Sequence, residues 1–326
     1  MNQRGVAALS AVLLLLCVPA IAQTDQHSTP PLFKIGASFV WVPALVRTES
    51  GATLPDVRAD QFRLWDDGVP QRVVPVDTRD LPVSLVILMQ TGGSAGRYLS
   101  SYASLASMLR PLVGDSAEEI TFVAFDSHID QIWHFPLRSD GVKYALTHQQ
   151  AGDQGAAIRD AVDFAVRQLQ AEPGRFRRIV LLLSEGTDSG SVTSSRALVQ
   201  RLGMASTVVY SIVFPGPKMN PRRRVNRERT NEPDNPSGRL EKASRALDTE
   251  SAAELASLTG GSSVQFDDQR SFNSALLQIS DHIRATYTLG FQPTMEVPGL
   301  HYLRVGVASP NLSVTARGVY WRPPAE

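Results

Sequence analysis

Alternating apolar runs and amphipathic stretches between residues 81 and 283 constrain the fold more than any other feature of this sequence. Five runs are rich in Val, Ile, Leu and Phe, as strands covered on both faces are; they span residues 83–89, 120–125, 179–184, 208–214 and 263–266. Apolar residues recur at helical spacing in four further stretches, around residues 99–112, 158–169, 255–258 and 272–283. This order predicts an α/β domain with a doubly wound, mainly parallel, Rossmann-like sheet, to which residues 130–137 add a short antiparallel edge strand.

Both ends of the chain have the pattern of short β-strands. The apolar runs of the two terminal regions, 31–80 and 284–322, lie at 33–48, 62–65, 69–76, 285–291, 302–308 and 313–321. Asp66-Asp67-Gly68 predicts a hairpin turn, because glycine accepts the positive φ that such turns need. Neither end holds enough strands to bury a core alone, so we expect both to combine into a small β-sandwich that carries the α/β domain as an insertion.

The first 22 residues have the features of a cleaved signal peptide. Arg4 precedes an apolar run, and Ala20-Ile21-Ala22 has the small-x-small pattern of a signal peptidase site. We therefore expect an exported protein that is periplasmic, held at the cell surface or released; a retained anchor is the alternative. Cys17 is the only cysteine, which leaves a mature chain without disulfides or thiolate ligands, and no later apolar run reaches membrane-spanning length.

Composition and motifs exclude several classes of function. The formal net charge is zero over 326 residues, so no global field attracts nucleic acid. The sequence has no phosphate-binding glycine loop, and its six histidines lack zinc-site spacing. Residues 216–237 are rich in Pro and Arg and poor in apolar side chains, which predicts a mobile loop whose Arg222-Arg223-Arg224 run could meet an acidic partner.

The glycine turn after the first central strand is the candidate site. Ligands of doubly wound sheets bind at the carboxyl ends of the strands, where the strand order reverses, and strand 179–184 is expected beside strand 83–89 at that point. Gly92 to Gly96 fits the G-x-S-x-G pattern of serine hydrolases. In that hypothesis Ser94 is the nucleophile. The acid of the triad is Glu185 or Asp188, and the base is His282 or His301.

Several short motifs carry a family resemblance. They are Trp65-Asp66-Asp67-Gly68-Val69-Pro70-Gln71, Leu258-Thr259-Gly260-Gly261, Tyr287-Thr288-Leu289-Gly290-Phe291-Gln292-Pro293 and Ala316-Arg317-Gly318-Val319-Tyr320. Residues 81–283 resemble a von Willebrand factor type A domain, and the chain as a whole resembles secreted bacterial proteins that carry such a domain between β segments. The resemblance implies a type A fold and a role in binding other proteins.

Type A domains usually hold Mg²⁺ at a metal-ion-dependent adhesion site (MIDAS), made of Asp-x-Ser-x-Ser, a Thr and an Asp. The corresponding positions here are Gln90, Gly92, Ser94, Ala156 and Glu185. One carboxylate and one hydroxyl remain, and Gln90 offers a carbonyl oxygen without charge, which is a poor set for a small hard cation. The resemblance therefore predicts a degenerate site with no cofactor, or at most weak Mg²⁺ binding.

These features favour a non-enzymatic, adhesion-type binding protein. Its partner is an unidentified protein or other component of the cell envelope, recognised without a bridging metal through Arg97, Glu185 and Asp188. Two alternatives stay open at this point: a Mg²⁺-dependent adhesion protein whose altered ligands still function, and a serine hydrolase that uses Ser94.

Overall fold

The computed structural model describes residues 39–76, 81–114, 119–136, 139–172, 177–216 and 235–324. All of these residues belong to one compact unit, Ala37–Glu326. The predicted signal peptide, residues 1–22, and most of the predicted loop 216–237 lie outside the described residues. Among the described residues, no helix is both long enough and apolar enough to cross a membrane.

A six-stranded sheet with the order β10-β9-β8-β5-β6-β7 forms the centre of the α/β domain. Its strands are β5 (Val83–Gln90), β6 (Glu119–Phe125), β7 (Ile129–Pro136), β8 (Arg177–Ser184), β9 (Thr207–Val213) and β10 (Ser263–Gln265). Neighbouring strands run parallel except β7, which pairs antiparallel with β6 at the edge. The predicted α/β fold, its mainly parallel sheet and its antiparallel edge strand are therefore confirmed.

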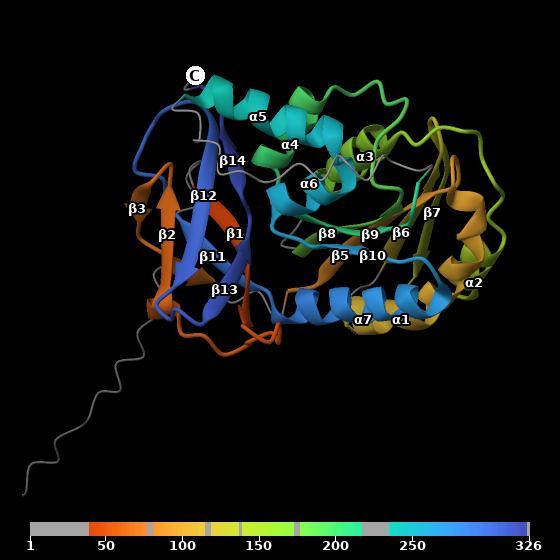
Figure 1. Cartoon of the computed structure of the whole chain (residues 1–326), viewed down its shortest axis with the longest axis horizontal. Coiled ribbons are helices and arrows are strands. Elements are labelled where there is room, and N and C mark those ends of the chain that lie inside the picture. Colours follow the sequence, from red (N-terminus) through yellow and green to blue (C-terminus); the bar gives the residue numbers. More distant parts are fainter. Residues whose placement is uncertain are drawn as a thin grey trace, which may run out of the picture. The chain divides into compact units, whose positions relative to one another are not determined.

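Helices cover both faces of this sheet (Figure 1). One face packs against α1 (Leu105–Val113), α2 (Asp140–Thr147) and α7 (Gln269–Ala285). The other packs against α3 (Ile158–Ala171), α4 (Ser195–Met204), α5 (Pro236–Thr249) and α6 (Ser251–Thr259). Apolar side chains from β5 and β8 face both layers, which explains why their sequences are apolar throughout.

Three helices were not predicted, and two predicted segments are corrected. The short helices α2 and α4 and the polar helix α5 lack a long apolar stripe, so their periodicity gave no signal. The predicted loop 216–237 overlaps α5, which starts at Pro236, a favourable first-turn residue, after the Asn235 side chain accepts the Gly238 N–H at 2.7 Å. The stripe 99–112 is helical, but residues Leu99–Ser104 form a 3₁₀ helix before α1 begins.

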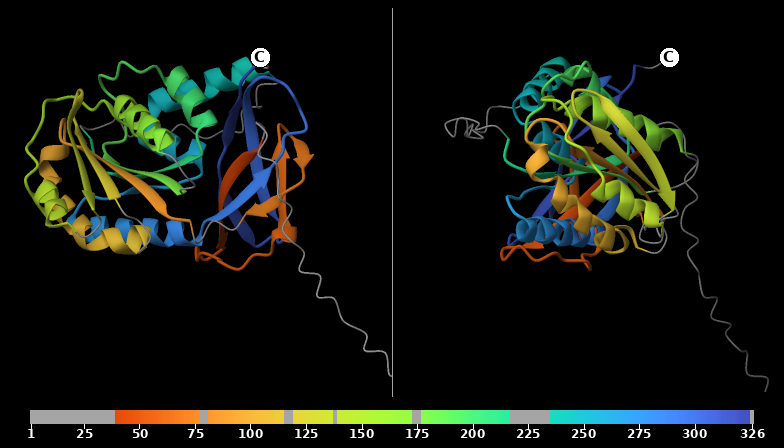
Figure 2. Two further views of the ribbon diagram at one scale, coloured as in Figure 1. Left: turned by 180° about the vertical axis from the view of Figure 1, so that it is seen from behind. Right: turned by 90° about the vertical axis from the view of Figure 1, so that its right-hand side faces the viewer.

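Strands from both ends of the chain form two four-stranded sheets, with the orders β13-β1-β11-β4 and β14-β12-β2-β3. Their bounds are β1 (Val40–Thr48), β2 (Phe62–Asp66), β3 (Val69–Gln71), β4 (Val74–Val76), β11 (Tyr287–Phe291), β12 (Gly299–Val307), β13 (Leu312–Ala316) and β14 (Val319–Arg322). The sheets share one apolar core that includes Val42, Phe62 and Phe291, and Figure 2 shows them facing each other. The predicted β-sandwich is confirmed.

Two runs predicted as single strands are each divided between the two sheets. Run 69–76 becomes β3 and β4, and run 313–321 becomes β13 and β14. The hairpin turn between β2 and β3 has the predicted positive φ at Gly68, 83°, and also one that was not predicted, 49° at Asp67. Local β-pattern could not show where the chain changes sheets, because residues on both sides of the crossing are equally strand-like.

Arg317 lies at one of these crossings and is buried. Its guanidinium donates to the carbonyls of Val319 at 2.7 Å and Trp41 at 3.2 Å in the sandwich. It also donates to Leu202 at 3.1 Å and Gly203 at 2.6 Å, in the last turn of α4, where carbonyls lack partners within the helix. Burial lowers the pKa of Arg317 to about 10. A single cation thus joins the sandwich to the α/β domain.

His301 forms a second buried polar group within the sandwich, next to the β2–β3 turn. Its Nδ1 lies 2.8 Å from Asp67 Oδ2 and 3.2 Å from Asp66 Oδ1, and its Nε2 lies 2.7 Å from the Val297 carbonyl. Tyr320 donates to the other Asp66 oxygen at 2.7 Å. Burial alone would lower the pKa of His301, but the hydrogen bonds to Asp66 and Asp67 outweigh it and raise the pKa to about 9. The ring is therefore a doubly protonated imidazolium at neutral pH.

Replacement of Arg317 by Met should lower the free energy of unfolding by about 3 kcal/mol, because four carbonyls lose their shared donor in a buried place. Urea unfolding measures this loss. The control is Arg245→Ala, which removes an exposed arginine of α5 that pairs with Glu241, a pair worth about 0.5 kcal/mol. Equal losses in the two variants would contradict the role of Arg317.

Replacement of His301 by Gln should remove a pH-dependent contribution to stability. Since the folded pKa is raised from 6.5 to about 9, this contribution is complete below pH 6.5 and is lost as the pH rises through about 9. We expect the wild type to exceed the variant by about 3 kcal/mol near pH 6, with the difference shrinking by pH 10. Urea unfolding at several pH values tests this, with His148→Gln as the control at an exposed histidine. A difference that does not change with pH would exclude the buried imidazolium.

Candidate functional site

A cleft of about 1270 Å³ opens at the carboxyl ends of the central strands. Its lining includes Ser94, Arg97, Glu185, Asp188, Phe214 and Asp267. β5 pairs with β6 on one side and with β8 on the other, so the cleft lies where the strand order reverses, as expected for a ligand site of this fold. All three predicted partner-binding residues line it: Arg97 is exposed, whereas Glu185 and the Asp188 side chain are buried.

Gln90, the last residue of β5, connects the two loops that form the floor of this cleft. Its buried side chain accepts the Glu185 backbone N–H through Oε1 at 2.9 Å. Its Nε2 donates to Glu185 Oε1 at 3.0 Å and to the Gly92 carbonyl at 3.0 Å. The Glu185 N–H requires an acceptor, which fixes the amide orientation and points the NH₂ group at the Glu185 carboxylate. The carbonyl oxygen that the sequence offered as a ligand is therefore already used.

Gly92 and Ala156 also lie at this edge, and neither can supply a hydroxyl. A Cβ on Gly92 would lie 2.3 Å from the Gly155 carbonyl oxygen and 2.8 Å from that of Asp153, so a serine does not fit this backbone. Ala156 is buried and exchanges two backbone hydrogen bonds with Ser189, of 3.0 and 2.8 Å. The structure thus brings the five predicted MIDAS positions to one edge of the sheet. At that edge Ala156 offers only its backbone groups and a methyl side chain.

The residues at these positions do not fit Mg²⁺. A divalent cation needs several anionic or carbonyl oxygens directed at one point, whereas Gln90 directs an N–H donor at the only carboxylate among the five. Within the described part of the chain, two groups bring three potential ligands together: Asp66, Asp67 and His301, and Asp126, His128 and Asp153. Glu185 belongs to neither group. In the first, both ring nitrogens of His301 are already hydrogen-bonded.

The second acidic group holds the loops beside the cleft in place. Asp126 Oδ1 accepts the His128 N–H and its Oδ2 accepts the Asp153 N–H, both at 3.1 Å. Asp153 in turn accepts the Gly155 N–H at 2.7 Å, and a hydrogen bond from the Ser127 hydroxyl lowers the pKa of Asp153. Sequence analysis missed this group, because its members come from two loops and show no metal-ligand spacing.

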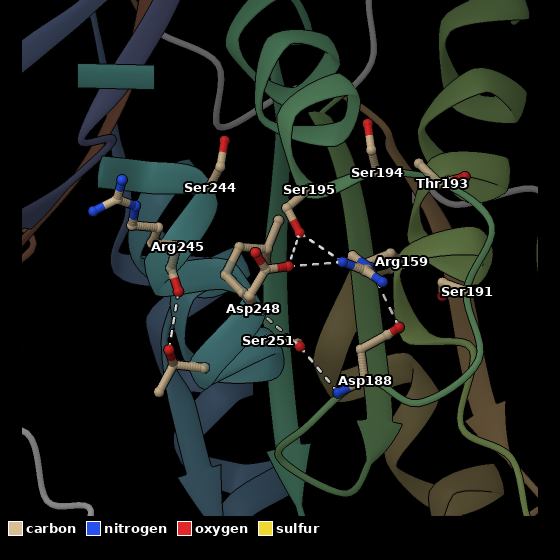
Figure 3. A network of polar contacts seen from close by, with 12 residues as sticks. Arg159, Asp188, Ser191, Thr193, Ser194, Ser195, Ser244, Arg245, Asp248 and Ser251 are labelled. Atoms are coloured by element: carbon tan, nitrogen blue, oxygen red, sulfur yellow. Dashed lines mark hydrogen bonds and ion pairs between the residues drawn. The ribbon is translucent and has the colours of Figure 1, made fainter. Parts of the chain in front are cut away.

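A network of charged and hydroxyl groups lies behind Asp188 (Figure 3). Arg159 of α3 lies 3.3 Å from Asp188 through Nε, and its Nη1 donates to Ser195 at 2.6 Å and to Asp248 at 2.8 Å. The Asp188 N–H is bonded to Ser251 at 3.0 Å. Arg159, Ser195 and Asp248 come from three different helices, so no sequence pattern could associate them with Asp188.

Burial changes the acidity of both carboxyls of the cleft. It raises the pKa of Glu185, against the opposing effect of the hydrogen bond from Gln90. It also raises the pKa of Asp188, against the opposing effects of a hydrogen bond from Ser191 and of the charge of Arg159. The Asp188 side chain is only 4% exposed and pairs with Arg159 at 3.3 Å. Both carboxyl groups are therefore poorly solvated.

The geometry does not assemble the catalytic triad of the hydrolase hypothesis. Ser94 precedes a short 3₁₀ helix, Ala95–Arg97, in the same cleft as Glu185. His282 instead contacts Arg47 and Ser262, and burial, together with the Arg47 charge, lowers its pKa to about 4. His301 lies in the sandwich, and neither histidine lines the cleft with Ser94. The G-x-S-x-G pattern is here a turn that closes β5.

Solved structures that are similar to this chain include von Willebrand factor type A proteins, the family that the sequence motifs resemble. The type A protein from Catenulispora acidiphila is 10% identical, covering 87% of this chain and 72% of that one, with a TM-score of 0.44. An aerotolerance-related membrane protein from Bacteroides fragilis is 18% identical over 62% of this chain and 98% of that one, with a TM-score of 0.41. Mussel proximal thread matrix protein 1, with a zinc-occupied MIDAS, is 14% identical, covering 66% of this chain and 49% of that one, with a TM-score of 0.40.

No protein-family model and no curated protein matches the sequence. With TM-scores below 0.5, the structural likenesses do not bear on ligands or partners. What the cleft of this chain can bind therefore has to follow from its own residues.

Replacement of Gly92 by Ala should destabilise the protein by at least about 2 kcal/mol, because the new methyl group would collide with backbone oxygens. The control is Gly96→Ala, whose Cβ would lie 3.7 Å from Ala151, an ordinary contact. Thermal unfolding of both variants measures the difference. A tolerated Gly92→Ala substitution would mean that the 151–157 loop yields, and that a MIDAS serine could be accommodated.

Proposed function

We propose that this protein is an exported, non-enzymatic binding protein whose cleft recognises a protein partner of the cell envelope without a bridging metal ion. In this proposal residues 81–283 form the recognition domain, and residues 31–80 and 284–322 form the sandwich that carries it. The signal-peptide pattern of residues 1–22 supports export. The type A resemblance of the motifs supports protein recognition over catalysis.

The hydrogen bonds of Gln90 are the observation that carries the proposal. They join Gln90 and Glu185, which lie 95 residues apart in sequence, in the way that a shared cation would join the two loops. Hydrogen bonds within the protein thus take over the positioning of the loops, and the cleft is preformed without an ion. A partner must then be recognised by shape, hydrogen bonding and the charges of the lining residues.

The position of the cleft also favours a macromolecular ligand. At about 1270 Å³ it exceeds the usual volume of a small-molecule pocket, about 300–1,000 Å³. Its lining is formed by the loops after β5, β8, β9 and β10, the part of such folds that is specialised for binding. Formal neutrality of the whole chain argues against nucleic acid as the ligand.

Affinity capture from an envelope extract of the source organism tests the proposal. The immobilised protein, without residues 1–22, should retain the same partner in the presence and absence of EDTA. Ser94→Trp, which fills the cleft without changing its charge, should reduce retention at least about tenfold, a loss of about 1.4 kcal/mol. Ser100→Trp, at an exposed position that does not line the cleft, is the matched control.

Two outcomes would contradict the proposal. Retention that EDTA abolishes and Mg²⁺ restores would establish the metal-dependent alternative. Retention that Ser94→Trp leaves unchanged, in a variant that unfolds at the wild-type temperature, would place recognition outside the cleft.

A further inference from the structure

Three segments of the chain meet at the floor of the cleft: the β5 turn (residues 90–96), the loop 151–157 and the loop 184–189. Gln90 joins the first segment to the third through its hydrogen bonds with Glu185. Two backbone hydrogen bonds, of 3.0 and 2.8 Å, join the second segment to the third. These are the three segments that carry the MIDAS positions, and the protein connects them through its own groups.

The loop 151–157 also packs directly on the β5 turn. The Gly93 N–H donates to the Asp153 carbonyl at 2.8 Å. The two segments approach so closely that a Cβ on Gly92 would lie 2.3 Å from the Gly155 carbonyl oxygen. The loop therefore occupies the space into which a serine side chain at position 92 would extend.

Asp126, which directly follows β6, holds this loop at two points. Its carboxylate accepts the His128 N–H through Oδ1 and the Asp153 N–H through Oδ2, both at 3.1 Å. Its backbone carbonyl accepts the Ala157 N–H at 2.7 Å. Asp126 is 6% exposed and is not among the residues that line the cleft. Any effect of Asp126 on the cleft must therefore act through the loop.

Both oxygens of the Asp126 carboxylate are needed for this arrangement. A backbone N–H that loses its acceptor in a buried place costs free energy, and an ionised acceptor forms the stronger hydrogen bond. The Asp153 N–H belongs to the loop itself, so its bond to Asp126 also fixes the Asp153 carbonyl to which Gly93 donates. The contact between the loop and the β5 turn thus depends on a carboxylate outside both segments.

We propose that Asp126 is a positioning residue for the cleft, which acts by fixing the loop 151–157 against the β5 turn. Through this loop it places Gln154, and through the backbone pair of Ala156 also Ser189, in the lining of the cleft. The inference rests on the proposed function and names the residue that, together with Gln90, replaces a shared cation. Loss of its hydrogen bonds loosens the loop and lowers the fraction of molecules with a formed cleft.

Hydrogen exchange of the protein without residues 1–22 tests the link between Asp126 and the loop. In Asp126→Asn one side-chain oxygen remains, and the new NH₂ group faces one of the two N–H donors. The amides of residues 152–157 should exchange at least about tenfold faster than in the wild type. The amides of β8 and β9 should exchange as in the wild type.

The same experiment with EDTA and with Mg²⁺ separates hydrogen bonding from metal binding. Asp126, His128 and Asp153 are close enough together to share a metal ion, so a chelator is a necessary arm of the test. In the wild type, neither EDTA nor Mg²⁺ should change the exchange of residues 152–157.

Asp160→Asn is the matched control. Asp160 also accepts two backbone N–H groups, those of Val192 at 2.9 Å and Thr193 at 2.7 Å. Neither Val192 nor Thr193 is among the residues that line the cleft. This variant should loosen residues 191–193 and leave the exchange of residues 152–157 unchanged.

Capture from the envelope extract connects the loop to recognition. Asp126→Asn should retain at least about tenfold less of the captured protein than the wild type does, whereas Asp160→Asn should stay within about twofold. With the captured protein purified, the loss should appear in the association rate, because a formed cleft releases its partner at the same rate. Thermal unfolding of both variants checks that their global stabilities are comparable.

Four results would overturn the inference. They are unchanged exchange of residues 152–157 in Asp126→Asn, faster exchange in the wild type with EDTA, capture by Asp126→Asn equal to that of the wild type, and an equal loss of capture in Asp160→Asn. The second result would mean that a bound ion holds the loop. The third would mean that the position of the loop does not matter for recognition.

The two proposals fail separately. If Ser94→Trp abolishes capture but Asp126→Asn does not lower it, only the role of Asp126 is wrong. If Ser94→Trp captures as well as the wild type does, the proposed function fails, and the exchange experiment still decides whether Asp126 fixes the loop.

Discussion

The hydrogen bonds of one buried side chain link the two loops at the carboxyl edge of the central sheet. Gln90 accepts from the Glu185 backbone and donates to the Glu185 carboxylate and to Gly92. An aspartate at this position would add a second negative charge beside Glu185, which a bound cation or a shared proton would have to offset. The amide instead donates to the Glu185 carboxylate directly and links the two loops through hydrogen bonds within the protein.

The remainder of the molecule holds these loops in register. The sandwich is joined to α4 through Arg317 and to α5 through the ion pair of Arg239 with Asp67. Helices α4 and α5 in turn supply Ser195 and Asp248, which position Arg159 behind Asp188. A chain of polar contacts therefore runs from the sandwich to the cleft; it is buried at Arg317 and exposed at Asp248.

The sequence allowed prediction of the features that depend on local pattern. Apolar runs located the central strands, the Asp67-Gly68 pair located a hairpin, and the glycine turn after β5 located the cleft. The sequence pattern did not predict elements whose structure depends on distant partners. Helix α5 is too polar to show an apolar stripe, yet it packs against β12. The opposite roles of the two ends of the Gln90 amide likewise depend on Glu185, 95 residues away, and could not be read from either segment alone.

A crystal grown with Mn²⁺ and measured at its absorption edge tests the central claim most directly, because Mn²⁺ occupies Mg²⁺ sites and gives a strong anomalous signal. The account predicts no anomalous peak between Gln90, Ser94 and Glu185, and an electron density in which the Gln90 amide contacts Glu185. An ordered Mn²⁺ bonded to Ser94 and Glu185, with Gln90 turned so that its oxygen faces the ion, would contradict it.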